Sequence, residues 1–128
     1  MSKATHVSLT VACDPHLARI VRMTAANVAT LSSMSVERVE DIRMAAEEAF
    51  IYACGTVAGS DLVIDFDTDE THLAMTFALD VPAFAEPSDD DPTAAYVDLI
   101  LGSVCDVYEK HEQPARLLLD VKADVNAL

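Results

Sequence analysis

Two helical patterns follow each other near the start of the chain with no strand between them. This order of elements restricts the folds that the chain can adopt. Residues 5–12 alternate apolar and polar side chains, which is typical of a half-buried strand. The Asp-Pro pair at 14–15 predicts the start of a helix that runs to about Ser32. Ser35 predicts the cap of a second helix, whose apolar stripe extends to Gly55. The pattern therefore does not match a chain of repeated strand-helix-strand units.

Strand patterns dominate the rest of the chain. The runs LVIDF at 62–66 and LAMTFAL at 73–79 flank a short acidic turn and predict an antiparallel hairpin. Three prolines predict an exposed loop at 81–92, helical spacing predicts a helix over 93–109, and RLLLDVKA predicts a last strand at 116–123. We therefore expect an α/β fold, a two-layer α/β sandwich in which a largely antiparallel mixed sheet is covered on one face by about three helices.

Length and composition indicate one acidic globular domain over residues 1–128. The chain has 22 acidic and 8 basic residues, a formal charge of −14, and 52% hydrophobic residues. That hydrophobic fraction is too high for a disordered chain, and the surplus of acid argues against nucleic acid and anionic membranes as partners. We expect neither a signal peptide nor a membrane-spanning segment, and hence a soluble cytoplasmic protein. The three cysteines lie in apolar patterns and are expected to be buried and reduced.

The second helix carries the candidate for acid-base chemistry. Glu48 and Tyr52 share one stripe of this helix, because steps of four residues return to the same face. A partly buried Glu48 would have a raised proton affinity and could act as a general base. The alternative is that Glu47 and Glu48 form a solvated helix face and pair with Arg43 or Arg38 at helical spacing.

No residue pattern predicts a metal site. Residues 65–69 place an aspartate at every second position, as a calcium loop does, but Glu70 and Thr76 stand where such a loop needs Gly and Glu. The four histidines lack the spacing of zinc ligands, and three glycines are too few for a loop that cradles phosphate. The acidic run at 88–91 is interpreted as a solubilising segment, with a weak cation site or a docking patch for a basic partner as alternatives.

Two segments of the first half resemble a known family. The strings DPHLARIVRMTAANVA (14–29) and VERVEDIRMAAEEAFIYAC (36–54) are similar to the N-terminal half of the anti-sigma factor serine kinases. These kinases are small members of the GHKL (Bergerat-fold) ATPase superfamily, which includes histidine kinase catalytic domains. Arg22 matches the arginine of the family's first helix, and Glu48 matches the glutamate of its N box. The resemblance covers residues 5–80 and extends loosely to the last helix and strand.

The resemblance implies a histidine kinase-like ATPase fold, and it implies that Glu48 is the base that activates a substrate serine. It also locates departures from the family's nucleotide motifs. Tyr52 stands in place of the asparagine that helps to hold magnesium, while Asp80 matches the aspartate that binds adenine. A Pro-Ala pair at 82–83 replaces glycines near the base, and the lid motif near 92–97 contains no glycine. These changes imply a degenerate ATP-binding site.

As to function, the resemblance implies a regulatory protein-binding module that acts by contact, without ATP turnover or a cofactor. The implied partners are a sigma factor or an anti-anti-sigma protein of the STAS type, with homodimerisation and with contacts around Arg19 and Arg22. The alternative is an ATP- and magnesium-dependent protein-serine kinase that phosphorylates an anti-anti-sigma protein, with Glu48 as base and Asp80 at the adenine. A third alternative is that the old pocket binds another small molecule.

Overall fold

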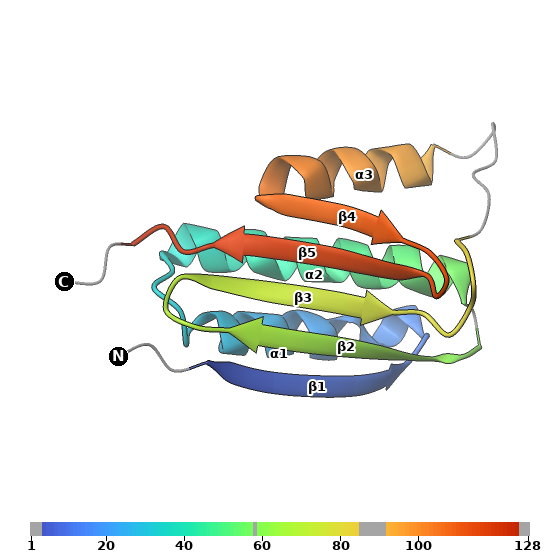
Figure 1. Ribbon diagram of the computed structural model, residues 1–128, viewed down its shortest axis with the longest axis horizontal. Helices are drawn as coiled ribbons and strands as arrows, with labels where there is room; N and C mark the ends of the chain where they lie inside the picture. The colour runs from blue at the N-terminus through green and yellow to red at the C-terminus, as the bar shows by residue number, and fades with distance from the viewer. Residues whose placement is uncertain (1–3, 58, 85–91, 126–128) are drawn as a thin grey trace.

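The structure, a computed structural model, describes residues 4–57, 59–84 and 92–125. Within these ranges the chain is an α/β two-layer sandwich, in which helices cover one face of a single five-stranded sheet (Figure 1). The elements in chain order are β1 (Thr5–Ala12), a 3₁₀ turn (Pro15–Leu17), α1 (Ala18–Ala29), α2 (Val36–Thr56), β2 (Asp61–Thr68), β3 (His72–Ala78), α3 (Thr93–Val104), β4 (Val107–His111) and β5 (Arg116–Lys122).

The strands lie in the order β1–β2–β3–β5–β4, and every described neighbouring pair is antiparallel. The prediction of a mixed sheet is therefore wrong for the strands that the structure describes. The connections explain the difference. Two consecutive helices return the chain to the end of the sheet where β1 finishes, so that Ala12 pairs with Asp61 at the start of β2. The single helix α3 leads to β4, which is separated from β3 by β5.

The predicted helix over 93–109 is also wrong in its last part, because α3 ends at Val104 and a strand follows. Cys105 has an extended backbone (φ −87°, ψ 145°), and β4 then pairs with β5. Val107 continues the apolar helical spacing of α3 by coincidence, whereas β-branched and aromatic residues such as Val107 and Tyr108 also favour a strand. The carboxylate of Asp106 accepts the backbone N–H of Lys122 at 2.7 Å and ties the start of this hairpin.

Local capping explains where the 3₁₀ turn before α1 and the helix α2 begin, and the side-chain caps by Asp14 and Ser35 are confirmed. The α-helix α1 itself begins later, at Ala18, and its N-cap residue Leu17 makes no side-chain hydrogen bond. The carboxylate of Asp14 accepts the backbone N–H of His16 at 2.9 Å, in the 3₁₀ turn that precedes α1. The hydroxyl of Ser35 accepts the backbone N–H of Arg38 at 3.1 Å at the start of α2. The first helix ends at Ala29, before the predicted end.

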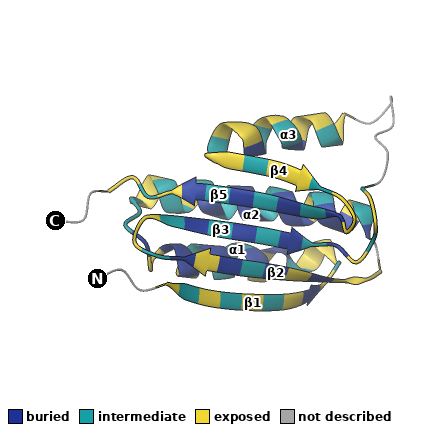
Figure 2. Ribbon diagram, viewed as in Figure 1, coloured by how far each residue is buried: buried dark blue, intermediate teal, exposed yellow. Residues whose placement is uncertain are grey.

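The core lies between the helices and the inner face of the sheet (Figure 2). Alanines at 45, 46, 49 and 53 of α2 are fully buried, and these small side chains let the helix pack close to the strands. Alternate strand positions supply the large buried side chains, because successive residues of a strand point to opposite faces. They are Leu62, Ile64, Phe66, Leu73, Met75, Phe77, Leu117, Leu119 and Val121.

The hairpin of β2 and β3 is confirmed, with Phe66 opposite Met75 and a turn in which Asp69 accepts the N–H of Thr71 at 2.8 Å. Of the loop predicted at 81–92, residues 81–84 and 92 are described, and the acidic run at 88–91 lies outside the described residues. None of the helices in the described ranges is long and apolar enough to cross a membrane.

Candidate functional site

The structure brings two of the three predicted site residues together and leaves the third apart. Glu48 and Tyr52 lie one turn apart on α2 and are both half-buried. Asp80 is exposed just beyond the end of β3, in an open hollow of about 320 Å³ that neither Glu48 nor Tyr52 lines. The other residues that line this hollow are Val81, Pro82, Gln113 and Pro114.

Tyr52 is held by a lysine and an aromatic ring. The ammonium of Lys110 on β4 donates to the Tyr52 hydroxyl at 3.1 Å and lies 4.8 Å from the centre of the Tyr52 ring. The ring of Phe84 stacks on Tyr52 with 6.0 Å between ring centres and 22° between planes. The same ammonium lies 5.8 Å from the centre of the Phe84 ring. Each ring therefore offers its face to the cation, which is a favourable arrangement for both.

Asp98 on α3 completes this group, which we call the Tyr52 cluster (Tyr52, Phe84, Asp98, Tyr108 and Lys110). The Lys110 ammonium lies 2.9 Å from one carboxylate oxygen of Asp98, and the hydroxyl of Tyr108 donates to that oxygen at 2.7 Å. The cluster thus joins α2 to α3 and β4 through charge-assisted hydrogen bonds.

The charge states in the cluster follow from these contacts. Burial lowers the pKa of Lys110, but hydrogen bonds and charges from Asp98 and Tyr52 outweigh it and raise that pKa above its ordinary value. Burial, followed by the hydrogen bond to Asp98, raises the pKa of Tyr108 far above its ordinary value. At neutral pH the cluster therefore holds an ammonium ion and a neutral Tyr108 phenol.

Glu48 is less organised than its neighbour Glu47. Glu48 forms no hydrogen bond or ion pair with any residue that the structure describes, so no partner orients its carboxylate. Glu47 instead accepts from Nη1 of Arg22 on α1 at 3.2 and 3.3 Å. The predicted pairing of these glutamates with Arg43 or Arg38 is therefore wrong. Arg43 pairs with Glu40, whereas Arg38 pairs with Asp41 and Asp106.

Metal-binding geometry is absent from the described ranges, where no group of three or more His, Cys, Asp or Glu residues is placed to hold a metal ion. The Tyr52 hydroxyl, which stands where the resembled family has a magnesium ligand, is bonded to a cation. These residues do not fit a magnesium ion.

Sequence reasoning missed three members of the Tyr52 cluster, namely Asp98, Tyr108 and Lys110. The error follows from assigning residues 107–109 to a helix. In a strand, Tyr108 and Lys110 lie two residues apart and share one face, so that both can reach Asp98. The β-branched and aromatic pair Val107–Tyr108 was the signal for a strand that could have found them.

The solvent side of the helical layer carries exposed apolar side chains. Ile20 and Met23 of α1 are about half exposed, at 50% and 48%, and Met44 and Ile51 of α2 are also exposed. We call this surface the outer helical face (Ile20, Met23, Met44 and Ile51). Methionines adapt to varied partner surfaces, so this face is chemically suited to contact with another protein.

No protein-family model matches the sequence, and no curated protein matches it either.

Proposed function

We propose that the chain is a regulatory protein-binding module, similar to an anti-sigma factor, which acts by contact and does not turn over ATP. Its partner in this proposal is a sigma factor or an anti-anti-sigma protein of the STAS type, and it acts as a homodimer in the cytoplasm, where such partners work. The observation that carries the proposal is the bond from the Lys110 ammonium to the Tyr52 hydroxyl.

The ammonium of Lys110 in this bond would repel the magnesium ion that a kinase would need at Tyr52. A magnesium ion lies about 2.1 Å from its oxygen ligands. Lys110 Nζ is 3.1 Å from the Tyr52 hydroxyl, so a magnesium ion on that hydroxyl would lie within about 5 Å of the ammonium. At an effective dielectric constant of about 20, the two cations would repel each other by about 6 kcal/mol. Phosphoryl transfer depends chiefly on magnesium to neutralise charge, and this arrangement therefore favours contact over catalysis.

The outer helical face supports the contact part of the proposal. Its exposed side chains come from two helices that pack on one another, with two side chains from each helix. The opposite side of the molecule is different, because the outer face of the sheet carries acidic residues such as Asp65 and Asp67.

The protein-serine kinase remains the second candidate, and one observation favours it. The carboxylate of Glu48 is half-buried and free of partners among the described residues, which leaves it able to accept a proton. In this alternative ATP and magnesium are cofactors and Asp80 binds the adenine.

Calorimetric titration with ATP and ADP, with and without magnesium, separates the two candidates. We expect no binding of nucleotide up to millimolar concentration. Micromolar binding that depends on magnesium would refute the proposal and favour the kinase. As a control, Tyr52→Asn restores the family's residue while leaving Lys110 in place, and we expect it to remain without magnesium-dependent binding.

A second titration tests the contact itself with a purified sigma factor and a purified STAS-type protein. We expect one of the two to bind, and we expect the double substitution Met23→Gln, Met44→Gln to weaken that binding. Val63→Thr, which removes an exposed apolar side chain from the sheet instead, is the matched control and should bind normally. Failure of both proteins to bind the wild type contradicts the proposed partners.

A further inference from the structure

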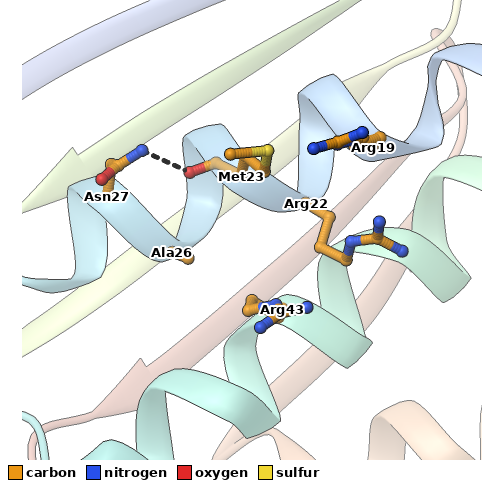
Figure 3. Close-up of a pocket in the computed structure, with 6 residues that line it drawn as sticks. All are labelled: Arg19, Arg22, Met23, Ala26, Asn27 and Arg43. Carbon is orange, nitrogen blue, oxygen red and sulfur yellow. Dashed lines mark hydrogen bonds between the residues drawn. The ribbon is translucent and has the colours of Figure 1, made fainter.

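Three arginines meet at a hollow between α1 and α2, on the side of the helical layer away from the Tyr52 cluster. The hollow has a volume of about 390 Å³. Figure 3 shows Arg22 extending from α1 towards α2, with Arg43 on the facing side of α2. The lining residues are Arg19, Arg22, Met23, Ala26, Asn27 and Arg43.

The hydrogen bonds of these arginines leave donors without acceptors. Arg22 uses one nitrogen, Nη1, for both oxygens of Glu47, and its buried Nε donates to no described atom. Nη2 of Arg22 also forms no hydrogen bond with a described residue. Because Nε is closed to solvent, Nη2 is the Arg22 nitrogen that can donate to a second oxyanion. Arg43 donates to Glu40 through Nη1 at 2.9 Å. Arg19 has no hydrogen bond or ion pair with the part of the chain that the structure describes.

The local charge is unusual for this chain. The protein has 8 basic residues and a net charge of −14, yet three of the arginines line this one hollow. Glu40 and Glu47 offset two of the three positive charges, which leaves a net positive site on an otherwise acidic molecule. Like charges in one hollow repel each other, and an anion bound among them removes that repulsion.

The lining also limits the size and chemistry of a ligand. Met23 and Ala26 form an apolar wall beside the guanidinium groups, and a volume of about 390 Å³ is that of a site for a small molecule. Guanidinium forks match the planar oxygens of carboxylates and phosphates in a bidentate manner. A short carbon skeleton that carries one or two such groups would satisfy both the donors and the apolar wall.

We propose that the hollow between α1 and α2 binds a small molecule with a carboxylate or phosphate group. Arg19 and Arg22 supply the hydrogen bonds, and Arg43 adds positive charge from the facing helix. This site goes beyond the proposed protein-binding function and is tested without any protein partner, so the two proposals succeed or fail separately.

The test is a titration of the ¹⁵N-labelled protein with inorganic phosphate in one arm and succinate in the other, with ionic strength held constant by sodium chloride. We expect saturating shifts of amide signals at 19–27 and 40–47, with millimolar affinity. Saturation with phosphate alone identifies a phosphate ligand, saturation with succinate alone identifies a carboxylate ligand, and saturation with both supports the shared oxyanion chemistry.

Two variants decide whether the arginines are responsible. Arg19→Gln removes donors that have no partner in the described part of the fold, so the variant should fold normally and bind about tenfold more weakly. Arg116→Gln, outside the hollow, should bind as the wild type does, since Arg116 donates only to the carbonyl of Pro114 among described residues. The absence of saturating shifts with both anions would overturn the proposal. Equal affinity of Arg19→Gln and the wild type would overturn it as well.

Discussion

Replacing Lys110 with methionine tests whether the Tyr52 cluster holds the fold or serves a nucleotide. The substitution keeps the length and apolar stem of the side chain but removes the ammonium. Its bond to Asp98 is worth about 1 kcal/mol, a low value because the Asp98 side chain is 44% exposed. The hydrogen bond to Tyr52 adds about 0.5 kcal/mol, and the two cation-π contacts together add about 0.5 kcal/mol more. We therefore expect Lys110→Met to lower the free energy of unfolding by about 2 kcal/mol.

Urea denaturation followed by circular dichroism measures this loss as a lower midpoint with an unchanged slope. A thermal scan should show a midpoint lower by roughly 7 °C. Lys122→Met is the matched control, because the Lys122 side chain is exposed and has no partner in the described ranges. It should change stability by less than about 0.5 kcal/mol. A double-mutant cycle with Asp98→Asn should return a coupling energy of about 1 kcal/mol.

The reasoning is refuted if Lys110→Met is as stable as the wild type. In that case the ammonium adds nothing to the packing of α2 against α3 and β4. If the variant is stable and the wild type binds ATP while the variant does not, then Lys110 is a phosphate ligand, and the kinase becomes the favoured function. The two readouts therefore separate a structural lysine from a nucleotide-binding one.

Three further predictions concern other parts of the fold. Ser35→Ala removes the cap of α2 and should lower the free energy of unfolding in urea by about 1 kcal/mol, and an unchanged midpoint would contradict that role. A hydrogen bond to Asp67 raises the pKa of His6, against an opposing effect of desolvation. The contact with Asp67 therefore stabilises the fold fully below the unfolded-state pKa of His6, which is about 6.5. This contribution is lost as pH rises through the higher folded-state pKa of His6. In the His6→Gln variant the free energy of unfolding should depend less on pH in this range. A pH profile identical to that of the wild type would count against this role of His6. Burial raises the pKa values of Cys54 and Cys105 to about 12, so neither thiol should react with Ellman's reagent at neutral pH before unfolding, and rapid labelling of the native protein would disprove this.

Sequence alone was sufficient where the signal is local. The caps at Asp14 and Ser35 depend on residues two and three positions away, and the hairpin of β2 and β3 depends on alternation beside a short turn. These features were predicted correctly because neighbouring residues determine them.

The contacts that could not be predicted from the sequence join segments that are distant along the chain. Arg38 of α2 donates to the carbonyls of Val104 and Lys122, which lie 66 and 84 residues further along the chain. Arg22 of α1 donates to Glu47 of α2, which lies 25 residues further along the chain. Many arrangements of an arginine and a carboxylate fit the same helical spacing, and the packing of one helix against another selects among them. The pairing of charges is therefore a property of the folded chain.

The two adjacent glutamates of α2 show why Tyr52 is more informative than Glu48 about function. Glu47 points towards α1 and is fixed by Arg22, whereas Glu48 has no partner in the described residues. A partly exposed carboxylate is well solvated, so it can persist on a helix with or without a catalytic task. A residue that binds magnesium is more constrained, because it must present an oxygen that no other cation already contacts. The choice between contact module and kinase therefore depends on Tyr52 and on Lys110, whose ammonium donates to the Tyr52 hydroxyl.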